Sequence, residues 1–197
     1  MVNLYGGYAR HPLITEDAYA LVFCHELGHH LGGTPRKIFS STNLPGWPST
    51  EGQSDYFASL KCLRRVFEKD NNEEIVSKLD LPQEVKEQCQ ESFKDANEAF
   101  ICMRTAMAGL ATASISSTIR EKDPPRFDLA DTKIVGKTYE GHPSPQCRLD
   151  TYFQGALCEV PYSSSLSVKD ETKGTCHQTN GHERGLRPGC WFKPKEI

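Results

Sequence analysis

Two histidines and a glutamate lie within one short stretch of the chain, at a spacing that suits a metal ion. His25 and His29 are four residues apart, so both imidazoles lie on one face if this stretch is helical. Neutral imidazoles are ordinary zinc ligands, at about 2.0–2.1 Å from the ion. Glu26 directly follows the first histidine, where it can take a proton from water that the zinc activates. The pattern therefore predicts a zinc site with Glu26 as the general base.

The opposite interpretation is a pair of surface histidines on the polar face of a helix. A chance match to the whole pattern is rare in a chain of this length, below about one in a hundred, and this favours the metal site. His30 is turned away from the face that His25 and His29 share, so we expect it to be structural or exposed to solvent.

Two imidazoles need a third protein ligand, with one position left open for water. One known arrangement uses a third histidine six residues after the second, but Pro35 stands there and excludes it. Another uses a glutamate from a following helix, and Glu51 meets this requirement. Asp55 lies one turn further along the same face, where it can fix the tautomer of a ligand imidazole. Alternatively, Glu51 is only an acid at a helix N-terminus, stabilised by the helix dipole.

Helices must hold these groups, and the local sequence predicts where they begin and end. Thr15 is followed by two acids and then by apolar residues at helical spacing, which predicts a helix that stops at Gly32-Gly33. Residues 34–50 carry three prolines and several hydroxyl side chains, so we expect a loop. A second helix is expected from about Ser49-Thr50 to Phe67.

The remaining segments predict a mainly helical fold. The expected elements are a short strand over residues 2–8, a short helix from Leu81-Pro82, a long helix over about 95–121 and another over about 145–158. The fold class is therefore α+β, mainly α with a small β element at the N-terminus. We expect a domain over residues 1–160, with an irregular cysteine-containing tail, residues 161–197, packed on it.

The eight cysteines form no CxxC pair, which argues against a zinc ribbon or a thioredoxin-type redox site. An even number at this density suits disulfides in an oxidising compartment, whereas the alternative is eight buried thiols in a cytosolic protein. The pairing cannot be read from the spacing. Residues 1–5 lack the features of a secretory leader, so we expect a periplasmic or secreted protein whose leader is absent from this chain.

The composition argues against some classes of partner. Lys and Arg number 23 against 26 Asp and Glu, a formal net charge of −3, which does not favour binding to nucleic acid or to an anionic membrane surface. The longest apolar run, residues 99–119, is interrupted by Arg104 and diluted by small residues. A spanning helix needs roughly 20 mostly apolar residues, so we expect a buried helix here and no transmembrane segment.

The motif from Cys24 to His30, followed by Glu51 and Asp55, resembles that of the gluzincin metallopeptidases. Two further segments resemble the HtpX/Oma-like group, which includes the CaaX prenyl proteases. These segments are residues 3–8 (NLYGGY) and residues 141–148 (GHPSPQCR). The resemblance implies a soluble, exported member with a minigluzincin-like zincin domain and a disulfide-rich C-terminal tail.

The resemblance also implies roles for individual residues. A strand along the cleft edge would pair with extended substrate, and it would consist of Asn3, Leu4, Tyr5, Gly6 and Gly7. His142 would approach the metal and steady the oxyanion or act as a displaceable ligand, with Arg148 as a nearby charge-balancing partner. His142 can also be interpreted as an ordinary loop histidine before a proline.

Together, these patterns predict a zinc metalloendopeptidase with one Zn2+ per chain, acting on a protein or peptide substrate. The alternative is a catalytically silent zinc-binding assembly or interaction factor of the cell envelope. A third interpretation is a disulfide-stapled interaction module without a metal. The cleft could also be closed by a regulatory plug or partner, and no side-chain pocket for the substrate follows from the sequence.

Overall fold

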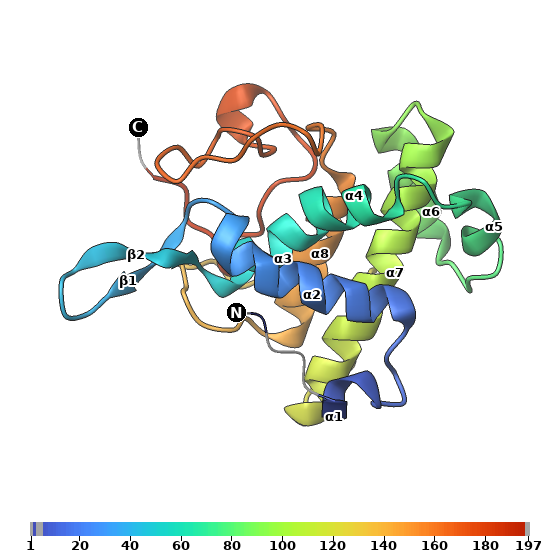
Figure 1. The fold of residues 1–197 in the computed structure, drawn as a ribbon, viewed down its shortest axis with the longest axis horizontal. Coiled ribbons are helices and arrows are strands. Elements are labelled where there is room, and N and C mark those ends of the chain that lie inside the picture. Colours follow the sequence, from blue (N-terminus) through green and yellow to red (C-terminus); the bar gives the residue numbers. More distant parts are fainter. Residues whose placement is uncertain (1, 3–5, 196–197) are drawn as a thin grey trace.

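A computed structural model of the chain describes residue 2 and residues 6–195. This part is mainly helical with one antiparallel two-stranded sheet, which confirms the expected α+β class (Figure 1). The elements are α1 (Gly6–Ala9), α2 (Glu16–Leu31), β1 (Arg36–Phe39), β2 (Leu44–Ser49), α3 (Glu51–Phe57), the π-helical segment η1 (Ala58–Cys62), α4 (Leu63–Phe67), α5 (Asn72–Val76), α6 (Gln83–Ser92), α7 (Ala96–Ile119), α8 (Pro145–Leu157) and the 3-10 turn η2 (Gln178–Asn180).

The helix α2 begins and ends close to where the sequence predicts. The Thr15 hydroxyl accepts a hydrogen bond from the Ala18 amide at 3.0 Å and caps the first turn. After Leu31 the chain leaves the helix, and Gly33 adopts a positive φ of 76°. The buried residues recur at helical spacing and form one face of α2: Ala18, Leu21, Cys24, His25 and Gly28.

The helix α3 packs directly against this face of α2. The Thr50 hydroxyl caps it by accepting from the Gln53 amide, and all seven residues of α3 are buried. Helical geometry continues through η1 and α4 to Phe67, as expected. The two helices meet at Gly28, where an added Cβ would lie 2.8 Å from the Ser54 Cα and 2.9 Å from the Ser54 carbonyl oxygen.

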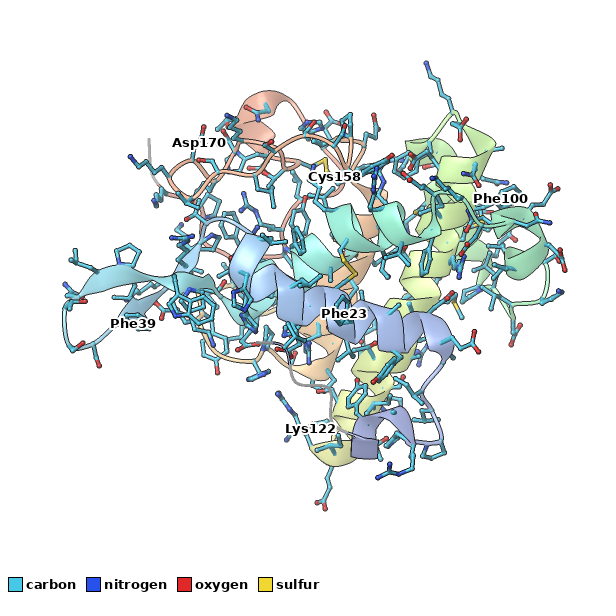
Figure 2. The ribbon with its side chains drawn as sticks, in the orientation of Figure 1. Phe23, Phe39, Phe100, Lys122, Cys158 and Asp170 are labelled. Atoms are coloured by element: carbon cyan, nitrogen blue, oxygen red, sulfur yellow. A yellow bond between two sulfur atoms is a disulfide. The ribbon has the colours of Figure 1, made fainter. Side chains whose placement is uncertain are left out.

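The sheet lies where the sequence predicts a loop, so the prediction for residues 34–50 is wrong. Strands β1 and β2 form an antiparallel hairpin that projects from the helices, with Phe39 on it (Figures 1 and 2). The prolines that suggested a loop are compatible with this sheet. In the described residues β1 and β2 pair only with each other, so both are edge strands, where proline is tolerated. Pro45 pairs with Ile38 across the hairpin.

The strand expected near the N-terminus is not found where the structure describes the chain. Gly6 and Gly7 open the short helix α1 instead, so their assignment to an edge strand is wrong. A Gly-Gly pair supplies no side chains to pack on a sheet face, which explains its weak strand tendency. Asn3, Leu4 and Tyr5, the other residues of the predicted edge strand, lie outside the described residues.

The long helix α7 forms the centre of the core and packs against α2, α6 and α8. Of the described helices, only α7 is long and apolar enough to cross a membrane by length and composition, and 67% of its apolar window is buried inside the protein. A core helix of a soluble protein meets the same criteria. The expectation of no transmembrane segment therefore stays a prediction.

All eight cysteines form disulfides, as expected for an oxidising compartment (Figure 2). The pairs are Cys24–Cys62, Cys89–Cys102, Cys147–Cys190 and Cys158–Cys176. The Cys147–Cys190 disulfide attaches the irregular tail to the start of α8, and the Cys158–Cys176 disulfide attaches it to the end of α8. Trp191 and Phe192 of the tail are buried in the same hydrophobic cluster as Tyr56 of α3, so the tail packs on the helices.

We expect Gly28→Ala to destabilise the fold by about 1–3 kcal/mol, because the new methyl group would push the α2 backbone away from α3. Chemical denaturation measures this change in the free energy of unfolding. Gly136→Ala is the matched control, since nothing lies within 4 Å of its Cβ position. Equal stability of the two variants would contradict the close approach of the helices at Gly28.

Candidate metal centre

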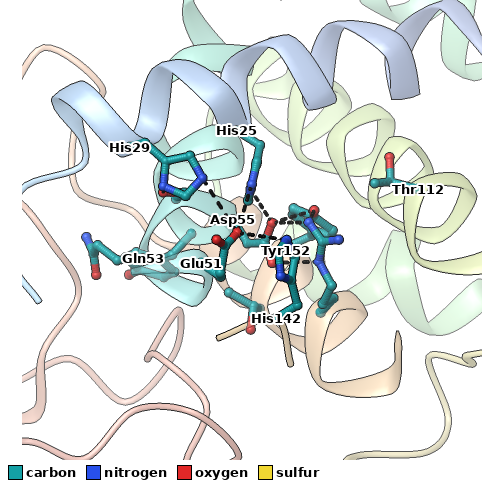
Figure 3. Close-up of polar contacts among 12 residues, drawn as sticks. His25, His29, Glu51, Gln53, Asp55, Thr112, His142 and Tyr152 are labelled. Atoms are coloured by element: carbon teal, nitrogen blue, oxygen red, sulfur yellow. Dashed lines mark hydrogen bonds and ion pairs between the residues drawn. The ribbon is translucent and has the colours of Figure 1, made fainter. Parts of the chain in front are cut away.

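Three of the predicted ligands converge between α2 and α3. The imidazoles of His25 and His29 point from α2 toward Glu51 at the first position of α3 (Figure 3). Nε2 of His25 lies 3.3 Å and Nε2 of His29 lies 3.5 Å from Oε2 of Glu51. One ligand atom from each of these residues lies within 4.8 Å of the others, a grouping that could hold a metal ion.

Hydrogen bonds on the outer nitrogens fix how both imidazoles face the centre. Nδ1 of His25 lies 2.6 Å from Oδ1 of Asp55, and Nδ1 of His29 lies 3.0 Å from the Ser49 carbonyl oxygen. Both oxygens are acceptors, so each Nδ1 carries a proton. In the neutral imidazoles, each Nε2 therefore presents a lone pair toward Glu51, as a metal ligand must.

The Glu51 carboxylate supplies the test of whether a metal fits here. Its Oε2 atom is buried and has no hydrogen-bond partner, although three imidazole Nε2 atoms surround it, from His25, His29 and His142. A buried carboxylate oxygen among imidazole nitrogens needs a positive charge beside it, which either a proton on an imidazole or a metal ion can supply. Two imidazoles and one carboxylate form a donor set that zinc accepts. The residues present therefore fit a zinc ion.

The electrostatics keep both acids of α3 ionised. Burial opposes ionisation of Glu51, but the nearby imidazoles of His25 and His29 and the hydrogen bond from Lys37 hold its pKa far below the usual range. Burial likewise opposes ionisation of Asp55, and the Arg148 guanidinium lowers its pKa well below the usual value. Without a metal, burial would lower the pKa of His25, but the charge of Asp55, its hydrogen bond to Nδ1 and the nearby Glu51 carboxylate raise the pKa to about 9.

Two side chains of α8, Arg148 and Tyr152, contact the candidate metal centre through Asp55. Arg148 donates to both of its oxygens, from Nε to Oδ2 at 2.8 Å and from Nη2 to Oδ1 at 2.6 Å. The Tyr152 hydroxyl donates to Oδ1 at 2.5 Å. Asp55 itself is fully buried. The structure thus places Asp55 against a predicted ligand imidazole, and it pairs Asp55 with Arg148, a contact that the sequence analysis does not specify.

His142 approaches the centre from the segment before α8 (Figure 3). Its Nε2 lies 3.2 Å from Oε2 of Glu51, and its side chain is 55% exposed. Burial of the ring lowers the pKa of His142, although the Glu51 charge opposes this effect. The segment is held by Arg120, which donates to the Pro143 carbonyl oxygen. An exposed imidazole at this distance can reach both the metal position and a bound ligand.

Glu26 lines a cavity of about 260 Å3 that opens beside the centre. The other lining residues are Val2, His29, His30, Lys37, Trp47 and Pro48. His30 is exposed and stacks on Trp47, with ring centroids 4.7 Å apart, as expected for a histidine outside the ligand face. A half-buried carboxylate in the same cavity wall as His29 is placed to exchange protons with a molecule in that cavity.

Two residues of the site are absent from the sequence prediction. Lys37 of β1 donates to Oε1 of Glu51 at 2.7 Å, but it lies in a segment predicted to be a loop, so no periodicity pointed to it. Tyr152 follows Arg148 by four residues in α8, and this spacing places both on one helix face. That spacing is a signal that could have identified Tyr152.

A second group of possible ligands does not form a metal site of thiolates. Asp131, Cys147 and Cys190 lie close together, but the two cysteines are joined in a disulfide. A cysteine binds a metal ion as the thiolate, which a disulfide lacks. This group therefore explains no further metal chemistry.

We expect Arg148→Met to lower the free energy of unfolding by about 3 kcal/mol, because the buried Asp55 carboxylate would lose its cationic partner. Thermal and urea denaturation measure the change. Arg126→Met is the control, since that arginine is mostly exposed where it pairs with Asp128. A variant as stable as this control would contradict the assigned role of Arg148.

Comparisons of the chain with protein-family models, with curated proteins and with solved structures found no match. The resemblance to the HtpX/Oma-like group is therefore carried by the motifs alone. The arrangement of His25, His29 and Glu51 stands independently of that resemblance. It identifies a candidate metal centre.

Proposed function

We propose that this chain is a zinc-dependent metalloendopeptidase that holds one zinc ion through His25, His29 and Glu51. The observation that carries the proposal is the buried Oε2 of Glu51, which has no hydrogen-bond partner and faces the Nε2 atoms of both α2 histidines. Three protein ligands leave a coordination position open, which is typical of catalytic rather than structural zinc. When bound, zinc acidifies water and polarises the substrate carbonyl.

Glu26 is the proposed general base. Its carboxylate lines the cavity beside His29, so it can take a proton from the attacking water and give it to the leaving amine. It does not need to bind the metal for this role. Proton transfer by a positioned carboxylate requires access to the reacting atoms, and the open cavity supplies that access.

His142 is the proposed donor to the oxyanion that forms at the scissile carbonyl. Its position near Glu51 and its exposed side chain support this role. The family resemblance instead allows it to be a displaceable ligand. Asp55 and Arg148 are positioning residues, because Asp55 orients His25 through Nδ1 and Arg148 holds Asp55.

The chain as a whole fits a minigluzincin-like zincin domain with a disulfide-stapled tail. The four disulfides are compatible with an oxidising location outside the cytoplasm, and we propose the periplasm or secretion. The substrate is a protein or peptide. A catalytically silent zinc-binding assembly factor would use the same ligands, but Glu26 beside an open cavity favours the enzyme.

We expect the purified protein to contain close to one zinc ion per chain, and His25→Ala and Glu51→Ala to lose it, because each removes one of the three ligands. Elemental analysis measures the zinc content. His30→Ala is the matched control on the same helix and should keep its zinc. Full zinc content in His25→Ala would rule out this centre.

We expect Glu26→Gln to keep its zinc and to lose about 10²–10⁴-fold in kcat for cleavage of an unfolded protein. The amide matches the carboxylate in shape but cannot accept the proton. Glu16→Gln, an exposed position in the first turn of α2, is the control and should cleave normally. Zinc-loaded wild-type protein that cleaves no unfolded protein would favour the silent assembly factor instead.

A further inference from the structure

A larger groove lies at the base of the hairpin. Its volume is about 560 Å3, and residues from four segments line it: Thr34, Pro35, Arg36, Ile38 and Pro45 of the hairpin region, Gly136, Lys137, Thr138 and Glu140, Val168, Lys169 and Glu171, and Lys193, Pro194 and Lys195. The C-terminal tail and the segment before α8 both pass near the start of the hairpin in Figure 1. The groove therefore joins segments that are far apart in the sequence.

The groove is strongly basic in a chain with a net charge of −3. Five cations line it: Arg36, Lys137, Lys169, Lys193 and Lys195. None of them forms an ion pair with a carboxylate of the described residues, although many other lysines and arginines do. Within the described residues, no carboxylate lies at ion-pair distance from these cations, so an acidic ligand could pair with them.

Two acids also line the groove, but backbone amides already engage both. Oε2 of Glu140 accepts from the Ile38 amide at 2.9 Å, and Oε1 of Glu171 accepts from the Lys195 amide at 2.8 Å. Their hydrogen bonds stabilise the groove walls. The groove thus keeps an excess of three positive charges over its two acids, since five cations line it.

A neighbouring arginine adds to this positive potential. Arg187 is buried and lines an adjoining cavity that shares Lys193 and Pro194 with the groove. Its guanidinium donates only to uncharged groups, which are the Thr34 and Glu171 carbonyl oxygens, the Gln53 amide oxygen and the Thr175 hydroxyl. Its charge is therefore not neutralised by a direct partner, and buried charges act over longer distances than exposed ones.

We propose that this groove binds an acidic, extended segment of a polypeptide. The five cations lie on four separate segments around a groove of about 560 Å3, so a chain that lies along the groove can meet cations from more than one segment. Apolar side chains lie between them: Pro35, Ile38, Pro45, Val168 and Pro194. Acidic side chains that alternate with apolar ones along an extended chain match both features. The positive charge of the groove thus favours an acidic polypeptide segment as its ligand.

The strand β1 connects this groove to the candidate metal centre. Arg36 and Ile38 line the groove, whereas Lys37 between them bonds to Glu51, as expected for alternating side chains of a strand. A segment in the groove would lie on the opposite face of β1 from the zinc ligands. On the proposed peptidase function, on which this step rests, the groove is an exosite that holds a substrate by a segment distant from the cleaved bond.

Binding can be measured apart from catalysis. A short fluorescein-labelled Glu/Ala peptide is titrated with the zinc-loaded Glu26→Gln protein, and anisotropy reports the Kd. We expect Lys137→Glu combined with Lys169→Glu to weaken binding by roughly tenfold or more, because four units of charge change at the groove. Added salt should weaken binding to the parent protein. Lys86→Glu combined with Lys94→Glu makes the same change at exposed positions of and next to α6, and should leave the Kd unchanged.

Several outcomes would overturn the groove assignment. One is an equal loss of binding in both pairs of variants, and another is equal binding of a Lys/Ala peptide. Binding of inorganic polyphosphate without binding of the Glu/Ala peptide would identify an anionic-polymer site instead. All four lysines are exposed, so their replacement leaves the core untouched.

Cleavage separates this proposal from the peptidase proposal. With an unfolded protein that carries an acidic tract, Lys137→Glu combined with Lys169→Glu should raise KM while kcat stays unchanged. If the protein binds the peptide but cleaves no protein, the groove proposal stands and the peptidase proposal is refuted. If the protein cleaves its substrate but does not bind the peptide, and the groove variant has an unchanged KM, the groove proposal is refuted and the peptidase proposal stands.

Discussion

Glu51 and Asp55 lie on one face of α3, a helix that is buried along its whole length. Two buried carboxylates four residues apart must each find positive partners or hydrogen-bond donors. Asp55 meets this need with Arg148, Tyr152 and the Nδ1 of His25. Glu51 meets it only in part, through Lys37 on one oxygen. The geometry of the centre follows from this difference, because the second Glu51 oxygen is available for a metal ion.

The hairpin helps to hold the centre together from the other side. Its strand β1 contributes Lys37 to Glu51 and the Ile38 amide to Glu140, two residues before His142. One short strand therefore contacts both a predicted zinc ligand and the segment that carries the predicted oxyanion donor. Trp47 on β2 stacks on His30 of α2 and forms part of the cavity wall beside Glu26. The hairpin thus belongs to the site and is not a peripheral extension.

Sequence reasoning succeeded where a single helical period decided the outcome. The face shared by His25 and His29, the cap at Thr15 and the pairing of Glu51 with Asp55 on one helix all follow from local geometry. It failed at the hairpin, because prolines signal loops locally while tertiary contacts allow them on exposed strand edges. Lys37 was missed for the same reason. The disulfide pairs could not be derived, since they depend on how distant helices pack. Gly6-Gly7 had too little intrinsic preference to specify a strand.

The disulfide between Cys24 and Cys62 joins α2 to the end of η1, and Cys24 directly precedes His25. Closing a loop of this length removes conformational freedom mainly from the unfolded chain, by about 4 kcal/mol in the loop-entropy model. In a thiol-reducing cytosol this contribution would be missing, and the two ligand-bearing helices would be held together less firmly. On the proposed peptidase function, the enzyme would reach its full stability only where its disulfides can form, so less of it would be active in a reducing compartment.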